Sequence, residues 1–148
     1  MALLSLSPTI LTGDPAEYKT LIEKYNPFTK RAQIDISDGT LAPNLTIPLT
    51  SVWWPKGWII DLHIMSQKPS EHLANIIKLK PNLAIFHSEI TEDLKPIFEE
   101  LQKIGIKAGI AITQSVYPGK INDLIALADH AMIFSGTLGQ NGGNANLM

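Results

Sequence analysis

Cysteine is absent from the 148 residues, which excludes disulfide bonds and thiolate-bound metal sites. A chain without cysteine suits a reducing compartment, and we expect a cytoplasmic protein. The sequence contains no cluster of Lys and Arg. The 12 Lys and Arg are outnumbered by 14 Asp and Glu, which gives a formal net charge of −2. Because binding to nucleic-acid phosphates needs a basic surface, we expect no nucleic-acid partner.

Long hydrophobic runs are missing as well. The apolar stretch at residues 1–11 has no basic leader and is interrupted by Ser5, Ser7 and Pro8, so it predicts a buried strand and neither a signal peptide nor a membrane span. We therefore expect no membrane partner. With 45% hydrophobic and 18% charged residues the composition is that of a globular protein, and we expect residues 1–148 to form one domain.

Six short apolar runs are distributed along the chain. They are rich in Ile, Leu and Ala and do not alternate strictly with polar residues, which indicates strands buried on both faces, as in a parallel sheet. The runs begin at Leu3, Arg31, Gly57, Asn82, Ile106 and His130.

Segments with helical spacing separate these runs. In the first, Asp14 is expected to cap a helix, Pro15 to occupy its first position and Glu17 to complete a capping box. Further helices are expected within 70–79, 91–105 and 120–128, and a short one after the proline-rich loop that begins at residue 38.

The alternation of strands and helices predicts an α/β protein built from βαβ units. We expect a TIM-barrel-type (β/α) repeat with about six parallel strands and five helices. Eight such units need about 200 residues or more, so the barrel is expected to be incomplete or shortened, with a Gly- and Asn-rich tail at 136–148. An open, flavodoxin-like parallel sheet remains an alternative that strand order would decide.

Polar residues follow the expected strands at their carboxyl ends. Ligands of α/β proteins gather at that end, so these positions are candidates for a site. His87 in particular is expected to face this rim and to bond a neighbouring carboxylate. The candidates are Thr9, Asp35, Ser37, Asp38, His63, His87, Thr113, Gln114 and Ser135.

Five motifs, in order and spacing, resemble the ribulose-phosphate 3-epimerase family. They are SPTILTGD, QIDISDGTLAPNLTI, IDLHIM, IFHSE and KAGIAI. The second is the most specific, because an acidic strand end followed by DG and then PNLT is hard to obtain by chance. The resemblance implies interconversion of ribulose 5-phosphate and xylulose 5-phosphate, in which a proton is removed beside a carbonyl and a metal stabilises the enediolate.

The resemblance also implies roles for particular residues. Asp35 would be the first acid/base group and a metal ligand, His63 a second ligand, and Gln33 a weak ligand where the family has His. The implied cofactor is a divalent metal (Zn, Fe, Mn or Co), with no organic cofactor. The implied substrate is a pentose phosphate or another sugar phosphate, bound by Thr9, Asn44, Met65, Gly142 and Gly143.

One part of the family pattern is not matched. The second catalytic Asp, in a VDGG motif, has no counterpart, since Asp123 falls on an expected helix and Asp129 enters a strand from the wrong end. We therefore expect impaired or absent activity for this chain. Two alternatives are a non-catalytic minimal (β/α) binding or structural domain and a self-associating enzyme whose copies complete one site. Because open strand edges favour pairing, a homo-oligomer is expected.

Overall fold

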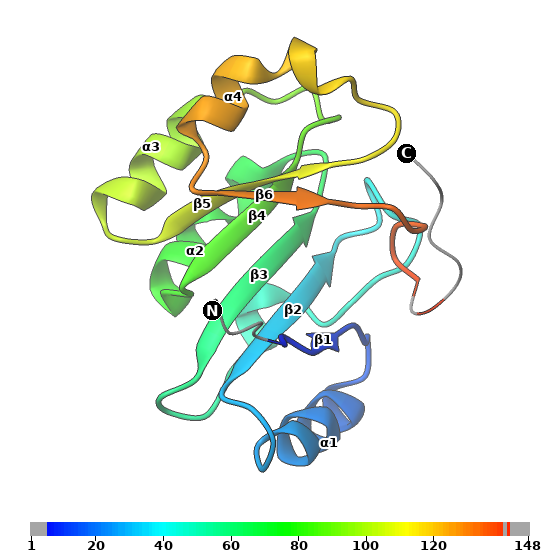
Figure 1. Cartoon of the computed structure of the whole chain (residues 1–148). Coiled ribbons are helices and arrows are strands. Elements are labelled where there is room, and N and C mark those ends of the chain that lie inside the picture. Colours follow the sequence, from blue (N-terminus) through cyan, green and yellow to red (C-terminus); the bar gives the residue numbers. More distant parts are fainter. Residues whose placement is uncertain (1–5, 141, 143–148) are drawn as a thin grey trace, which may run out of the picture.

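A computed structural model describes residues 6–140 and 142 of the chain (Figure 1). Within them, a six-stranded parallel sheet has the order β1-β2-β3-β4-β5-β6. The strands are β1 Thr9–Ile10, β2 Arg31–Ser37, β3 Ile59–Met65, β4 Leu83–His87, β5 Lys107–Ile112 and β6 His130–Ile133. The α-helices are α1 Pro15–Tyr25, α2 Leu73–Leu79, α3 Lys95–Lys103 and α4 Asn122–Leu127.

Three 3-10 helices complete the described elements: η1 Leu49–Ser51, η2 Pro69–His72 and η3 Pro118–Lys120. The short helix expected after the loop at residue 38 is η1, a single turn. Pro43, Pro48 and Pro55 surround it, and proline supplies no backbone N–H for a longer helix. Four of the five expected helices are therefore α-helices.

The two faces of the sheet differ. The outer face packs against the helices in one apolar core, which includes Ile34, Leu62, Phe86 and Ile110. Figure 1 shows α2, α3 and α4 along the same side of the sheet. The inner face has a smaller apolar cluster of Leu83, Ile85 and Ala111, with Met132 packed against it.

This arrangement decides between the two parallel-sheet architectures. A doubly wound sheet has helices on both faces and a strand order that reverses. Here the strand order follows the sequence and the helices pack into one core on the outer face. The expected TIM-barrel-type (β/α) repeat with six parallel strands is confirmed, and the flavodoxin-like order is not observed.

The start of α1 differs in one detail from expectation. Asp14 caps the helix by accepting a hydrogen bond from Ala16 N at 2.8 Å, and Pro15 follows it as predicted. Glu17 does not complete a capping box, because its carboxylate accepts from the Thr12 hydroxyl. The Asp14 backbone N–H instead donates to Thr12 Oγ1 at 3.1 Å. Thr12, which precedes the helix, thus accepts the hydrogen bond from the Asp14 N–H that was expected to go to Glu17.

The described helices are short, and α1 with 11 residues is the longest α-helix among them. No helix in this part of the chain combines the length and the hydropathy needed to cross a bilayer.

Candidate functional site

Strand register brings the expected polar residues to the inner face. Asp35 of β2 is paired with His63 of β3, and Thr9 of β1 is paired with Gln33. Side chains alternate along a strand, so Gln33 and Asp35 point to the same side. His87 lies two residues beyond Ile85, the partner of His63 in β4, and therefore shares that side too.

Asp35 is held by its neighbours. Its Oδ1 accepts a hydrogen bond from Gln33 Nε2 at 2.8 Å and lies 3.1 Å from His63 Nδ1. The side chain is 11% exposed. Among the described residues both contacts are made by Oδ1, and Oδ2 takes part in neither of them.

Two buried imidazoles continue from Asp35. Nε2 of His63 lies 2.7 Å from Nε2 of His87, and Nδ1 of His87 lies 3.2 Å from Glu89 Oε1. The side chains of His63 and His87 are 1% and 0% exposed. We refer to Asp35, His63, His87 and Glu89 as the acid–imidazole row. It crosses β2, β3 and β4 and ends just beyond β4.

The expectation that His87 bonds a neighbouring carboxylate is confirmed, with Glu89 as its partner. Glu89 itself was not predicted as a site residue, although its place two residues after the histidine in IFHSE was the available signal. Burial alone would raise the pKa of Glu89, but the hydrogen bond from His87 and the charge on its ring outweigh burial and lower it.

An aromatic side chain lies against the row. The Phe134 ring, just after β6, has its centroid 5.9 Å from that of His63 and 6.0 Å from that of His87. The two imidazole centroids are 4.9 Å apart. Since Phe134 is also apolar, it limits water around the imidazoles and strengthens the hydrogen bonds beside it.

The other predicted site residues lie near this face or outside the described part. Met65 is buried at the end of β3, and Thr9 is exposed on β1. Asn44 lies in the loop after β2, where its Oδ1 is buried without a hydrogen-bond partner among the described residues. Gly142 is exposed with a φ of +76°, and Gly143 lies outside the described residues.

The predicted metal ligands do not form a metal centre in this arrangement. Both ring nitrogens of His63 are engaged, and Gln33 turns its amide nitrogen, not its oxygen, toward Asp35. The opposite orientation of that amide would place two acceptors against each other. Over residues 6–140 and 142, no group of three or more His, Asp or Glu is placed to hold a metal ion. The residues present therefore do not fit a divalent metal as they stand.

Two cavities border this region. One of about 350 Å³ lies at the carboxyl ends of β4, β5 and β6, and its walls include Glu89, Thr113, Ser115, Phe134 and Thr137. Glu89 belongs to the acid–imidazole row and Phe134 packs against its imidazoles, so this cavity adjoins the Glu89 end of the row.

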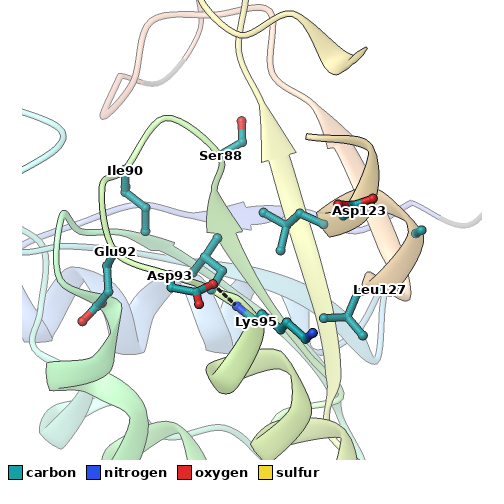
Figure 2. A pocket seen from close by; sticks show the side chains of 10 residues that line it. Ser88, Ile90, Glu92, Asp93, Lys95, Asp123 and Leu127 are labelled. Atoms are coloured by element: carbon teal, nitrogen blue, oxygen red, sulfur yellow. Dashed lines mark hydrogen bonds between the residues drawn. The ribbon is translucent and has the colours of Figure 1, made fainter. Parts of the chain in front are cut away.

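The other cavity is larger, about 540 Å³, and lies between the loop after β4 and α4 (Figure 2). Its walls include Ile90, Glu92, Asp93 and Leu127, and none of the acid–imidazole row. The hydrogen bond drawn in it, from Lys95 N to Asp93 Oδ1 at 3.0 Å, supports the first turn of α3. Volume alone therefore does not identify the candidate site.

A parallel sheet in sequence order, with helices on its outer face and acid and imidazole groups at the strand ends of its inner face, defines a TIM-barrel-type α/β protein. The chain belongs to the ribulose-phosphate 3-epimerase family, whose sequence model matches residues 5–146. The resemblance found in the five motifs is thereby confirmed.

Sequence matches to individual proteins also support membership of this family. Proteins named ribulose-phosphate 3-epimerase are 29% identical over 105 residues in Chlamydia muridarum and 27% identical over 115 residues in Chlamydia pneumoniae. These matches cover 69% and 73% of this chain but 46% and 49% of the relatives. A third, from Schizosaccharomyces pombe, is 21% identical over 149 residues, covering 96% of this chain and 65% of the relative. The chain spans about half the length of the first relatives it matches.

Proposed function

We propose that the inner face of the sheet is the acid/base site of an epimerase that interconverts ribulose 5-phosphate and xylulose 5-phosphate. Family membership supports the sugar-phosphate scaffold. The observation that carries the proposal is the Asp35 carboxylate at the end of β2, held through Oδ1 with Oδ2 left over.

In the proposed reaction, Asp35 takes the proton from the carbon beside the substrate carbonyl. Gln33 and His63 hold the carboxylate through Oδ1, so Oδ2 can accept the proton without a change of side-chain conformation. Negative charge then develops on the substrate oxygens and needs nearby donors. Hydroxyls of Thr113, Ser115 and Thr137 line the cavity beside Glu89 and are candidates for this role.

We further propose that Thr9, Asn44 and Met65 contact the sugar, with Gly142 and Gly143 on the phosphate. The buried, unpaired Asn44 Oδ1 supports this role, because a sugar hydroxyl would supply the missing donor. The pairing of Thr9 with Gln33, whose amide donates to Asp35, supports this role for Thr9.

Epimerisation needs a second acid/base group on the opposite face of the carbon. Two other carboxylates on this side of the sheet have partners, Asp61 with Arg31 and Glu89, through Oε1, with His87. We propose that this chain alone removes a proton but is impaired in inverting the carbon.

A self-associated form is the second candidate. β1 and β6 are the two ends of the described sheet, each paired on one side, and Ile133 of β6 is 60% exposed. Open strand edges favour pairing with another chain, so a homo-oligomer in which copies complete one site is proposed as the route to full turnover.

Proton removal and inversion can be measured separately. Ribulose 5-phosphate is incubated with the chain in D₂O, and ¹H NMR follows loss of the C3 proton while a coupled assay follows xylulose 5-phosphate. We expect solvent exchange at C3 with little product, and Asp35→Asn as the matched control should lose the exchange. If the C3 proton exchanged at the same rate with Asp35→Asn as with the unaltered protein, the proposed role of Asp35 would be overturned.

The same measurement addresses the alternatives. If the rate of xylulose 5-phosphate formation increased more than in proportion to the protein concentration, the self-associated enzyme would be favoured. Binding of the sugar phosphate without any exchange would favour a non-catalytic domain.

A further inference from the structure

Both ring nitrogens of His63 lie within hydrogen-bond distance of another side chain in this structure. A metal-bound imidazole offers one nitrogen to the metal and commonly donates the other N–H to a carboxylate. The contact of His63 Nδ1 with Asp35 Oδ1 at 3.1 Å matches that second role. Nε2 is then the nitrogen that would face a metal, and it lies 2.7 Å from His87 Nε2.

The contacts within the acid–imidazole row engage all four ring nitrogens of the two imidazoles. Three contacts join its four groups, and each needs one proton to be a hydrogen bond. Every ring nitrogen is then a donor or an acceptor within the row.

Packing stabilises this arrangement. Both imidazoles are buried, and the Phe134 ring lies against the pair at centroid distances of 5.9 and 6.0 Å. Glu89 fixes His87 from the far side through Nδ1. For His63 Nε2 to lose its contact with His87, the His87 ring would have to move. That movement is opposed by the packing around the buried ring and by its contact with Glu89.

We infer that His87 occupies, beside His63 Nε2, the place that a divalent metal would take, so that His87 and a metal compete for His63. His87 and Glu89 are then positioning residues: they orient His63 and keep it out of metal coordination. This inference deepens the proposed function, because it concerns the same site, but it does not depend on turnover.

The experiment measures metal binding by the chain without sugar phosphate. Co²⁺ is titrated into the 148-residue protein, with binding followed by visible absorption and by equilibrium dialysis. His87→Ala removes the competing nitrogen and leaves room, so its Co²⁺ affinity should rise about tenfold, the scale on which groups behind a metal ligand act. His87→Phe is the matched control: it fills the same space, so no comparable gain is expected.

A second variant tests whether the gain arises at His63. His63→Ala combined with His87→Ala should lose it. A fall in Co²⁺ affinity in His87→Ala would make His87 a ligand and overturn the inference, and an unchanged affinity would overturn it as well.

A measurement on the unaltered protein covers the case in which these variants do not fold. Long-range ¹H–¹⁵N NMR should show both imidazoles protonated at Nδ1, with ¹⁵N shifts at Nε2 that change little when stoichiometric Zn²⁺ is added. A large shift at His63 Nε2 at that concentration would contradict competition. Because no substrate is present, these outcomes are independent of the C3 exchange assay.

Discussion

Gly139 lies directly against Asn44, so that a methyl group on Gly139 would stand 1.7 Å from Asn44 Oδ1. Gly139 also has a φ of +78°, which L side chains rarely adopt. The contact joins the segment after β6 to the loop after β2, and Figure 1 shows these two segments side by side. A glycine is therefore required at this position both for backbone conformation and for space.

Gly139→Ala should lower the free energy of unfolding by about 2–4 kcal/mol, since strain and overpacking add. Gly57→Ala is the matched control, because Gly57 has a φ of +88° and a methyl group there would have nothing within 4 Å. We expect that variant to lose about 1 kcal/mol from strain alone. Urea unfolding measures both, and equal losses would contradict the close packing of Gly139 on Asn44.

Arg31 and Asp61 form an ion pair at the amino end of the inner face. Nε and Nη2 of Arg31 lie 3.0 and 2.7 Å from Asp61 Oδ2, and Asn82 Nδ2 donates to Oδ1 at 3.1 Å. Asp61→Leu leaves the Arg31 charge unpaired, so stability should fall by about 2 kcal/mol, less than for a fully buried pair because Arg31 is partly exposed. Urea unfolding of the variant checks this value.

The double variant Arg31→Met with Asp61→Leu removes both charges and should recover part of that loss. A double variant that unfolds as readily as Asp61→Leu would show that the unpaired charge is not the cause.

Asp38 links the loop after β2 to the loop after β3. Burial alone would raise the pKa of this carboxyl, but hydrogen bonds from Ser66, Thr40 and His72 outweigh burial and hold the pKa well below its usual range. A carboxyl with a lowered pKa in the folded state stabilises the protein above its unfolded pKa of about 3.9, and the stabilisation is lost as pH falls below that value.

Asp38→Asn should therefore reduce the free energy of unfolding by about 1–3 kcal/mol at pH 7. The difference between the unaltered protein and the variant should shrink as pH falls from about 4 toward 2. Urea unfolding at a series of pH values measures this difference. A difference that stays constant through that range would contradict an ionised, hydrogen-bonded Asp38.

Tyr18 of α1 donates a hydrogen bond to the Trp53 carbonyl at 2.6 Å, and burial raises the pKa of its phenol to about 12. Because this folded-state pKa lies above the unfolded value of about 10, its contribution is complete below pH 10 and is lost as pH rises toward 12. Ultraviolet absorbance should show one of the three tyrosines ionising late.

Tyr18→Phe should remove that late step and lower stability at pH 7 by about 1 kcal/mol, since the Trp53 carbonyl loses its donor. A late phenol transition that persists in the variant would assign it to another residue.

Local patterns were enough to predict much of the fold. The apolar runs identified the strands, and Asp14 with Pro15 identified the start of α1. The motif around Asp35 indicated the inner-face site and the family. These features depend on neighbouring residues or on short spacings, which a sequence displays directly.

Other features depended on contacts between distant segments. The contact of His63 with His87, 24 residues away, and the placement of Phe134 over both rings require the register and curvature of three or more strands.

The sequence by itself determined the class of fold and the family, and it indicated Asp35 as the candidate acid/base residue, because hydrophobic periodicity and motif spacing are local properties. Only the tertiary structure decided that His63 bonds to His87 instead of presenting a free nitrogen, and that Gln33 directs its amide nitrogen to Asp35. The physical reason is that a hydrogen bond between side chains on the same face of the sheet is selected by their distance and burial after the sheet has formed.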